Sequence, residues 1–366
     1  MIKRFGKNLE AMGRKIRTRL FPSYRRAFTA LLARGLSQHR EGEPIVCCDF
    51  ANPAIDAVGG RYYFSLVRDL IDAGYFPVFT ARRETLSTFG TSRMKSLLLT
   101  ERLGVIRSLD ELREPYYLIT DNADGTPKNS ERIVVVNYAW RVCCYADEIA
   151  FPFFVHPSIT PFPRPATQKT TARLFFGGNT MPGKYDKAII RDTYGMLSRR
   201  EMLAIAAAAI PADQIHKPSD ADEWLTSTDF HSYVICETQN CKIPPARWLE
   251  ALAKADFFLA CPGVGMPLCH NVIEAMAAGA VPILQYADYL SPPLQHGVNC
   301  LTFHDAQSLS DVLNSVFSMT EEERIPLRRG VQAYYQQHLA PGCFTHHLFD
   351  GPSARSLLFN AYRVPR

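Results

Sequence analysis

The chain lacks any apolar run long enough to cross a membrane as a helix. A spanning helix needs about twenty predominantly apolar residues, and no segment of this 366-residue sequence approaches that length. The first residues also lack the apolar central region and small-residue cleavage site of a signal peptide. We therefore expect neither a membrane-spanning helix nor an exported protein.

Closely spaced cysteine pairs of the kind that bind zinc are also missing. The sequence has 10 cysteines, and none of them forms a Cys-x-x-Cys pair. Several lie in apolar, strand-like stretches, including the adjacent pairs Cys47-Cys48 and Cys143-Cys144. This pattern favours reduced thiols in the core of a cytosolic protein over a zinc site or a disulfide framework.

Acidic residues are scarce in the first forty positions. Residues 1–40 contain eleven Lys and Arg but only Glu10 as an acid, which leaves 30 basic and 35 acidic residues in 41–366. Apolar residues also recur at three- and four-residue spacing on one face of a predicted helix, namely Ile2, Phe5, Leu9, Met12, Ile16 and Leu20. A basic amphipathic helix is typical of proteins that lie on an anionic membrane surface. We assign residues 1–43 to a basic helical head, with membrane contact through residues 1–40.

Other functions of the head remain open. The helix could pack its apolar stripe on the protein body, serve as a cleaved targeting peptide, or contact nucleic acid. Nucleic acid is not expected as a partner, because the rest of the chain is acidic and contains no recognised binding motif. The predicted location is cytoplasmic and peripheral at a membrane face.

From residue 44 onward the sequence predicts an α/β protein with two domains. A hydrophobic content of 47% supports a large packed core, and short apolar runs alternate with helical patterns, which indicates parallel sheets. Five prolines within 151–165 mark the domain junction. We predict domains at 44–165 and 166–366, the second with a C-terminal helical tail. The expected strands are 45–48, 76–80, 116–120, 133–137, 173–176, 233–236, 257–260, 281–284 and 301–303, and the main helices 61–73, 201–210 and 307–318.

The stretch 254–284 predicts a strand, a glycine-bearing loop, a helix and a second strand. Gly263 and Gly265 interrupt the first strand, and Pro267 suits a first helical position. Glu274 lies in a helix that is otherwise apolar, so a polar partner is expected for its carboxylate. Loops of this kind, at the carboxyl ends of parallel strands, are where α/β proteins bind phosphorylated ligands.

These residues resemble nucleotide-sugar glycosyltransferases of the GT-B fold. The Cys261-Pro262 start, Pro267 and the acidic residue before Ala275 are similar to the exostosin-type signature, and the run 274–279 resembles group-1 transferases. The resemblance implies two facing Rossmann-like domains, with the acceptor on the N-terminal one and the nucleotide of the donor on the C-terminal one. It also implies that Glu274 accepts hydrogen bonds from the donor ribose hydroxyls.

Two further stretches carry the same resemblance. Gly59-Gly60 is similar to the N-terminal glycine loop of the group-1 enzymes, where backbone approaches a phosphate or sugar. Gly178 and Lys184 resemble the loop in which a lysine neutralises the donor diphosphate. Tight turns and a solvated lysine are the simpler interpretations of these positions, as they are for Gly263 and Gly265.

The chain departs from these families at three positions. Asn179 stands where group-1 enzymes carry an arginine, Met266 where they carry a second glutamate, and His270 where the exostosin pattern favours arginine. His270 could bind the donor or cap its helix. No Asp-x-Asp motif follows a strand, so we expect a metal-independent transferase with no cofactor beyond the nucleotide-sugar co-substrate.

The proton acceptor is the least specified part of the site. Asp49 at a strand end, Asp56 in the next loop and His156 at the domain junction qualify by position, although each could be structural. The predicted function is transfer of a sugar from a nucleotide-diphosphate donor to a glycan or lipid-linked acceptor. A nucleotide-sugar epimerase on the same fold and a non-catalytic, membrane-associated glycan-binding relative are the alternatives.

Overall fold

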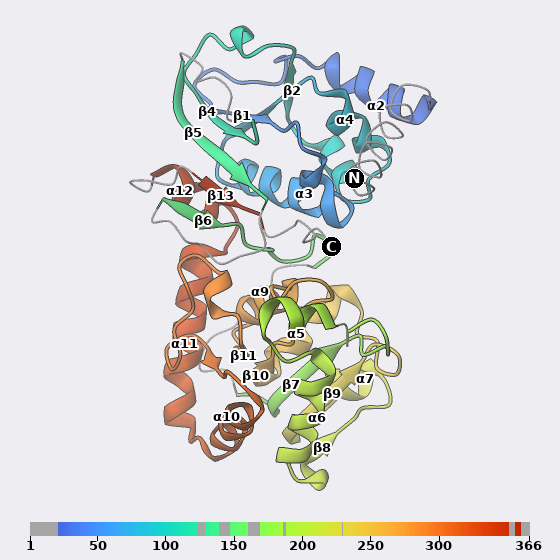
Figure 1. Ribbon diagram of the computed structural model, residues 1–366, viewed down its shortest axis with the longest axis vertical. Coiled ribbons are helices and arrows are strands. Elements are labelled where there is room, and N and C mark those ends of the chain that lie inside the picture. Colours follow the sequence, from blue (N-terminus) through green and yellow to red (C-terminus); the bar gives the residue numbers. More distant parts are fainter. Residues whose placement is uncertain are drawn as a thin grey trace. The chain divides into compact units, whose positions relative to one another are not determined.

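The computed structural model forms two compact units, described separately below (Figure 1). The first comprises Met1–Phe151 with Pro341–Arg366, and the second Pro152–Ala340. The structure describes residues 21–122, 129–138, 147–159, 169–185, 188–228, 230–350 and 356–359. The predicted helix in residues 1–20 and residues 160–165 of the proline-rich stretch lie outside these ranges. Residues 341–350 and 356–359, assigned above to the C-terminal domain, belong to the first unit.

A parallel seven-stranded sheet forms the first unit. Its strand order is β3-β2-β1-β4-β5-β13-β6, and every neighbouring pair is parallel. The strands are β1 (Ile45–Asp49), β2 (Phe76–Thr80), β3 (Gly104–Ile106), β4 (Tyr116–Thr120), β5 (Ser130–Asn137), β6 (Glu148–Ala150) and β13 (Ser356–Leu358). Because β13 lies between β5 and β6, the end of the chain completes this sheet.

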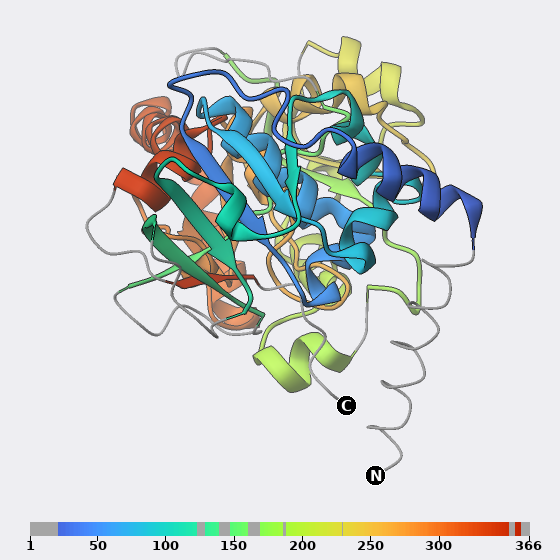
Figure 2. The ribbon, with the colours of Figure 1, turned by 90° about the horizontal axis from the view of Figure 1, so that it is seen from above.

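Helices and short 3-10 turns connect these strands. The α-helices are α2 (Pro22–Leu32), α3 (Ala57–Asp72), α4 (Arg83–Leu86) and α12 (Cys343–Asp350), and the 3-10 turns are η1 (Pro53–Asp56), η2 (Ser87–Gly90), η3 (Lys95–Thr100) and η4 (Leu109–Glu111). Figure 2 shows α2, in dark blue, along the periphery of the unit, where it packs on η2. Buried residues of neighbouring strands, among them Ile45, Val78 and Leu118, form a core cluster.

The second unit contains a six-stranded parallel sheet of order β12-β11-β10-β7-β9-β8. Its strands are β7 (Ala172–Gly178), β8 (Ile215–His216), β9 (Phe230–Glu237), β10 (Ala255–Leu259), β11 (Val281–Leu284) and β12 (Leu301–Thr302). Its helices are α5 (Ala188–Tyr194), α6 (Arg199–Ala209), α7 (Ala221–Thr226), α8 (Trp248–Ala253), α9 (His270–Ala277), α10 (Ala306–Ser318) and α11 (Glu321–His338), with 3-10 turns η5 (Ala212–Gln214), η6 (Pro245–Arg247) and η7 (Ala287–Tyr289).

The predicted α/β class with two parallel-sheet units is confirmed, whereas some element boundaries differ. The helix of the 254–284 stretch begins at His270 with Cys269 as its N-cap, and not at Pro267. The Gly263 N–H donates to the Pro267 carbonyl at 3.2 Å, so Pro267 belongs to a loop that closes on itself. Helix α3 begins at Ala57, four residues before the predicted start, since η1 leads directly into it.

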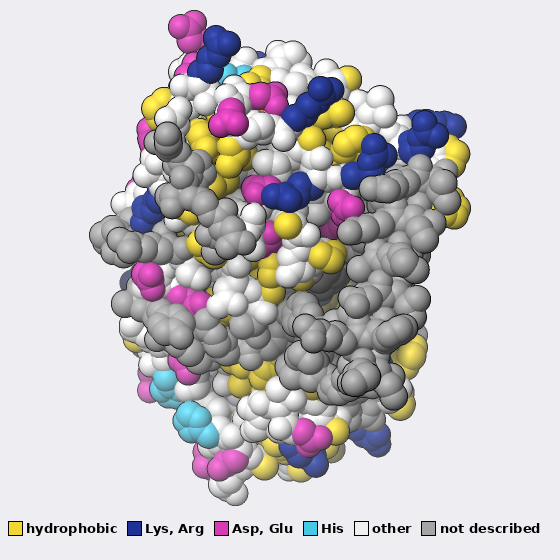
Figure 3. Space-filling model, turned by 45° about the horizontal axis from the view of Figure 1, so that its top comes forward, with side chains coloured by type: hydrophobic (Ala, Val, Ile, Leu, Met, Phe, Trp, Pro, Cys, Tyr) yellow, Lys and Arg dark blue, Asp and Glu magenta, His cyan; other side chains and the backbone are white. Residues whose placement is uncertain are grey.

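Charge is mixed on the face of the molecule that Figure 3 shows. In the view of Figure 3, Lys and Arg side chains are interspersed with acidic and apolar ones and form no continuous patch. Within the described residues, no helix has the length and apolar character needed to cross a membrane.

Candidate functional site

The strand order of the second unit reverses between β7 and β10, and this reversal locates the candidate site. The two strands are neighbours in the sheet, but the loops that follow them lead to opposite sides. Ligands of open α/β sheets bind outside the carboxyl ends of the strands at such a reversal. The relevant loops begin at Asn179 and at Ala260.

Two glycines at the end of β7 make room for large side chains on opposite faces of the sheet. A Cβ on Gly177 would lie 2.6 Å from the ring of Trp248, and a Cβ on Gly178 would lie 3.3 Å from Nη1 of Arg199. Successive strand residues face opposite sides, so Trp248 and Arg199 approach from different faces. Gly178 thus has a specific role in the structure, which is to let a guanidinium pass close to the backbone.

Arg199 connects the two loops at the reversal. Its Nη1 donates to the Asn179 carbonyl at 2.8 Å and its Nη2 to the Pro262 carbonyl at 3.1 Å. The residue is only 4% exposed, its guanidinium stacks on Tyr185 at 3.9 Å from the ring centroid, and its Nε has no hydrogen-bond acceptor within the described part of the chain. None of the described carboxylates pairs with it, so a buried positive charge remains uncompensated.

The position of Arg199 on its helix adds to this charge imbalance. Arg199 and Arg200 open α6, where the helix dipole favours anions over cations. The nearest acid along the helix, Glu201, accepts hydrogen bonds from the Ser198 N–H and from Arg191. The beginning of α6 is therefore an electropositive site of the kind that binds phosphate groups.

A pocket of about 480 Å³ opens beside this cation. It lies at the carboxyl ends of β7 and β9, and its lining residues are Thr180, Met181, Pro182, Tyr185, Arg199, Arg200, Leu203, Glu237, Gln239 and Asn240. Glu237 ends β9 and is paired in register with Gly178. No described side chain donates a hydrogen bond to its carboxylate. The pocket thus combines two arginines with an uncommitted carboxylate.

Glu274, which was expected to need a polar partner, accepts hydrogen bonds from the protein. It is 1% exposed, and its Oε2 accepts from Trp248 Nε1 at 2.7 Å while Oε1 accepts from the His156 N–H at 3.0 Å. The His156 and His270 rings lie with centroids 6.1 Å apart, and His156 Nδ1 hydrogen-bonds Ser158 Oγ at 2.7 Å. The structure therefore brings together three residues that the sequence suggested separately. The Glu274 carboxylate is thus buried, and each of its oxygens already accepts a hydrogen bond from the protein.

The other residues proposed for donor binding are placed as follows. Asn179 Oδ1 accepts from the Met181 N–H at 2.8 Å and shapes the turn after β7. Lys184 is exposed in that turn, with Nζ 5.5 Å from the Tyr185 ring centroid. Gly263 packs so tightly that a Cβ would lie 2.7 Å from the Met266 carbonyl, and Gly265 lies in the same loop.

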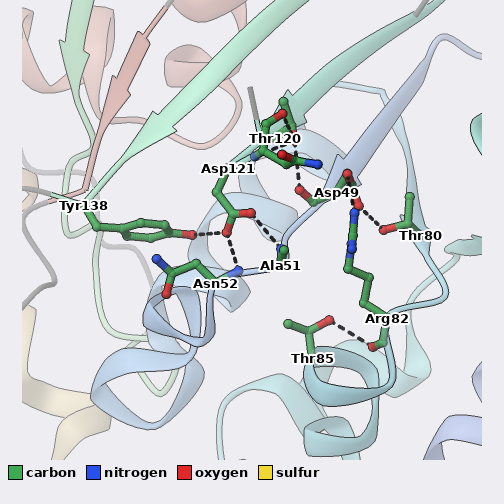
Figure 4. Close-up of polar contacts among 10 residues, drawn as sticks. Asp49, Ala51, Asn52, Thr80, Arg82, Thr85, Thr120, Asp121 and Tyr138 are labelled. Atoms are coloured by element: carbon green, nitrogen blue, oxygen red, sulfur yellow. Dashed lines mark hydrogen bonds and ion pairs between the residues drawn. The ribbon is translucent and has the colours of Figure 1, made fainter. Parts of the chain in front are cut away.

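The carboxyl edge of the first sheet carries Asp49, which is fully engaged (Figure 4). Its carboxylate accepts from Arg82 Nε at 2.6 Å, Arg82 Nη2 at 2.9 Å and Thr80 Oγ1 at 2.5 Å. Burial alone would raise the pKa of this carboxyl, but the hydrogen bonds from Arg82 and Thr80 outweigh burial and lower it. A carboxylate held in this way is a weak proton acceptor.

Asp121 connects the loops at the corresponding reversal of the first sheet, between β1 and β4. Its carboxylate accepts from the backbone N–H groups of Ala51 and Asn52 at 2.7 and 2.9 Å and from Tyr138 Oη at 2.9 Å (Figure 4). Burial and the Asp121 charge raise the pKa of the Tyr138 phenol, which therefore stays protonated as a donor. An acid performs here the bridging role that Arg199 performs in the second unit.

Asp56 is held by a buried lysine. Lys95 Nζ donates to Asp56 Oδ1 at 2.7 Å, to the Thr85 carbonyl at 2.6 Å and to Thr88 Oγ1 at 2.7 Å. Gly60 allows this contact, since a Cβ there would lie 2.7 Å from Lys95 Cγ. Gly59 and Gly60 have φ angles of +68° and +79°, which favour glycine. Gly60 thus admits Lys95, the first residue of η3, beside α3.

Sequence reasoning missed Arg199, Glu237, Asp121 and the two cations that hold Asp49 and Asp56. Glu237 had a readable signal, since it is a polar residue directly after an apolar strand, as Asp49 is. Arg199 had none, because only the fold distinguishes it from Arg200. The described ranges contain no cluster of three or more His, Cys, Asp or Glu side chains suited to a metal ion.

Comparisons with known proteins returned structural likenesses only. No family model and no curated protein matches the sequence. Among solved structures, HepE of Anabaena in complex with UDP is 11% identical, with 84% of this chain and 100% of that one covered at a TM-score of 0.43. WaaG, a glycosyltransferase involved in lipopolysaccharide biosynthesis, is 10% identical, with 84% of this chain and 100% of that chain covered at a TM-score of 0.35.

A glycosyltransferase from Rickettsia africae is similar at a comparable level. It is 10% identical, with 84% of this chain and 97% of that chain covered at a TM-score of 0.39. At these identities and scores the likeness concerns general architecture and carries no argument about ligands. Glycosyltransferases are thus among the structures that this chain resembles, in line with the resemblance found in its sequence.

Proposed function

We propose that the protein is a glycosyltransferase that uses a nucleotide-diphosphate sugar as donor. The single observation that carries this proposal is the pocket at the carboxyl ends of β7 and β9, beside the buried and uncompensated Arg199. When the bond between the sugar and the diphosphate breaks, negative charge develops on the departing diphosphate. A fixed cation in a poorly solvated site stabilises that charge without having to reorganise.

The nucleotide of the donor would lie in the pocket at the ends of β7 and β9, with its sugar toward the loop that follows β10. In this proposal Gly178, Asn179 and Lys184 form the diphosphate side of the site, and Gly263, Gly265 and His270 the opposite side. Glu274 accepts hydrogen bonds from Trp248 and from the His156 backbone N–H, and in this proposal it holds the segments beside the donor in place. No metal or further cofactor is part of the proposal.

The acceptor would bind at the carboxyl edge of the first sheet. Carboxylates, amides and a phenol gather there, which suits the hydroxyl groups of a glycan or of a lipid-linked sugar. Because Asp49 and Asp56 neutralise Arg82 and Lys95, we propose that they position their loops. His156 is then the best candidate for proton acceptor, with a pH profile of kcat as its test.

Nucleotide release and thermal stability test the proposal together. The purified protein is incubated with UDP-, GDP- and ADP-sugars and candidate acceptors, and the free nucleoside diphosphate is measured. A nucleoside diphosphate that binds the folded state should also raise the melting temperature. At a concentration of one hundred times its Kd it stabilises the folded state by about 2.7 kcal/mol. If none of UDP, GDP and ADP shifts the melting temperature, the proposal fails.

One observation keeps a second function in view, which is glycan binding without catalysis. Two of the three predicted proton acceptors are held in ion pairs, as an inactive relative could tolerate. Such a protein would bind glycan or nucleotide and release no nucleoside diphosphate from any donor. An epimerase on the same fold would convert the donor sugar without an acceptor, and analysis of the sugar after incubation separates it from a transferase.

A further inference from the structure

Two side chains of opposite charge face the pocket of the second unit from neighbouring strand ends. Arg199 approaches Gly178 at the end of β7, and Glu237 is the residue paired with Gly178 across β9. Residues paired across a parallel sheet point to the same face, so Glu237 and Arg199 lie on the same side. Neither residue forms an ion pair within the described part of the chain.

We propose that this pocket binds a ribonucleoside diphosphate at two poles, with the phosphates at Arg199 and the ribose hydroxyls at Glu237. The inference rests on the proposed function and adds to it the residues that recognise each part of the nucleotide. It moves the ribose contact from Glu274, as implied by the family resemblance, to a residue that the resemblance does not cover.

The phosphate pole follows from the charge of Arg199. A buried cation without a carboxylate is costly to keep, and the adjacent Arg200 and the beginning of α6 add charge of the same sign. Each Nη atom donates one hydrogen bond to a loop carbonyl, so Arg199 both fixes the two loops and presents its charge to the ligand. In this proposal Arg199 of α6 provides the positive charge that the arginine at the Asn179 position provides in group-1 enzymes.

The ribose pole follows from the difference between two glutamates. Both Glu274 oxygens accept hydrogen bonds from the protein and the side chain is buried. Glu237 is half-buried in the pocket wall, and no described group donates to its carboxylate. A carboxylate accepts hydrogen bonds from both hydroxyls of a vicinal diol, and the ribose of a nucleotide offers such a diol.

Comparison of UDP, GDP and ADP with their nucleosides tests the phosphate pole. Isothermal titration of the full chain identifies the tightest of the three, which is then compared with the corresponding nucleoside. We expect Arg199→Met to lower diphosphate affinity at least tenfold and nucleoside affinity little, because the charge-assisted interaction is lost. Arg199→Lys should keep most of the preference for the diphosphate. The control, Arg329→Met, removes an exposed arginine of α11 and should change nothing.

Comparison of the same diphosphate with its 2′-deoxy form tests the ribose pole. We expect the wild-type protein to prefer the ribose form about tenfold, and Glu237→Gln to reduce this preference to nearly one. Glu322→Gln, an exposed change on the same unit, is the matched control. If Glu237→Gln lowers the affinity for the ribose form and for the 2′-deoxy form by the same factor, the assignment of the ribose to Glu237 is overturned.

A measurement on the unsubstituted protein protects the test against misfolding of the Arg199 variants. The arginine Nε–H signals are followed by NMR while inorganic pyrophosphate is added, with Arg199→Lys used to assign its signal. We expect the Arg199 signal to shift in a saturable way, and no shift would overturn the phosphate pole. If UDP, GDP and ADP all fail to bind, the proposed function fails as well. If one binds with no change in the variants, only this inference fails.

Discussion

At the residue scale, this protein uses charged side chains to hold its loops in place. Arg199 ties two backbone carbonyls in the second unit, and Asp121 ties two backbone N–H groups in the first. A charged side chain that hydrogen-bonds the backbone of a neighbouring loop fixes the position of that loop, and its removal leaves the backbone groups unsatisfied. The cost of a substitution at such a position should therefore depend on the hydrogen-bonding groups that it leaves unsatisfied.

Glu274 provides a test at this scale. Glu274→Ala leaves the Trp248 Nε1 and the His156 N–H without an acceptor in a buried site, and we expect a loss of about 3 kcal/mol in unfolding free energy. Glu274→Gln retains one acceptor oxygen and should lose about half as much. Urea denaturation measures both variants. A loss for Ala no larger than that for Gln would contradict the assigned hydrogen bonds.

At the element scale, the C-terminal segment docks on α3 of the first unit. Asp69 of α3 accepts from the Gly342 N–H, the Thr345 N–H and Thr345 Oγ1 at 2.7 to 2.8 Å. These hydrogen bonds hold the start of α12 against α3. Farther along the chain, β13 lies between β5 and β6 in the sheet. The segment that contains β13 thereby completes a sheet whose other strands all lie within Ile45–Ala150, more than two hundred positions earlier in the chain.

Gly342 is the position at which this docking is most sensitive. Its φ is +82°, and a Cβ there would lie 3.0 Å from the backbone of Asp72 and Ala73. We expect Gly342→Ala to lower the unfolding free energy by about 3 kcal/mol, from backbone strain and overpacking together. Gly74→Ala is a close control, since its φ is +85° but the space around it is open, and it should cost about 1 kcal/mol. Similar losses in the two variants would argue against the close approach.

Asp69 should also give the first unit a distinctive pH dependence. Burial is the main cause that raises the pKa of this carboxyl to about 6, although hydrogen bonds from Thr345 and Gly342 oppose it. Because the folded form then binds its proton more tightly than the unfolded one, stability falls as pH rises from about 4 to 6 and levels off above that.

The size of this effect follows from the shift of about two pKa units, which corresponds to about 3 kcal/mol. Unfolding free energies of the wild-type protein and Asp69→Asn, measured at intervals between pH 4 and 8, isolate the contribution. The difference between the two proteins should change over this window and stay flat above pH 7. A difference that is constant from pH 4 to 8 would contradict the raised pKa.

At the scale of the whole molecule, charge is distributed very unevenly along the chain. The first forty residues carry eleven Lys and Arg and one acid, whereas residues 41–366 have 30 basic and 35 acidic residues. Of this head, the structure describes residues from Phe21 onward, and α2 packs on η2 of the first unit. The membrane contact proposed for residues 1–40 would therefore depend mainly on the first twenty.

Vesicle binding tests this proposal. The full chain should co-sediment with vesicles that contain phosphatidylglycerol, and a chain that lacks residues 1–20 should bind them at least tenfold more weakly. High salt should weaken binding because it screens the charges, and vesicles of phosphatidylcholine alone serve as the neutral control. Equal binding of the two chains would contradict a membrane role for the first twenty residues.

Much of the fold could be predicted from local sequence patterns. The apolar runs at β2, β4 and β11 matched the predicted strands residue for residue, because buried parallel strands are continuous apolar stretches with turn signals at both ends. Short edge strands such as β3 and β8 were missed, since two or three residues carry no periodicity. Helix α9 begins later than predicted. The preference of proline for a first helical position placed Pro267 in the helix, whereas the hydrogen bond from the Gly263 N–H to its carbonyl keeps it in the preceding loop.

The sequence by itself determined the α/β class, the 254–284 unit and the need of Glu274 for a polar partner, since each depends on residues close together in the chain. Only the tertiary structure decided which strand ends meet, and so placed Arg199 and Glu237 in one pocket and locked Asp49 and Asp56 against Arg82 and Lys95. The residues of each of these pairs are 33 to 39 positions apart along the chain. Whether a charged side chain binds a ligand or holds a loop depends on the groups that lie next to it in the folded protein. Those groups are distant in the sequence, so local sequence patterns do not identify them.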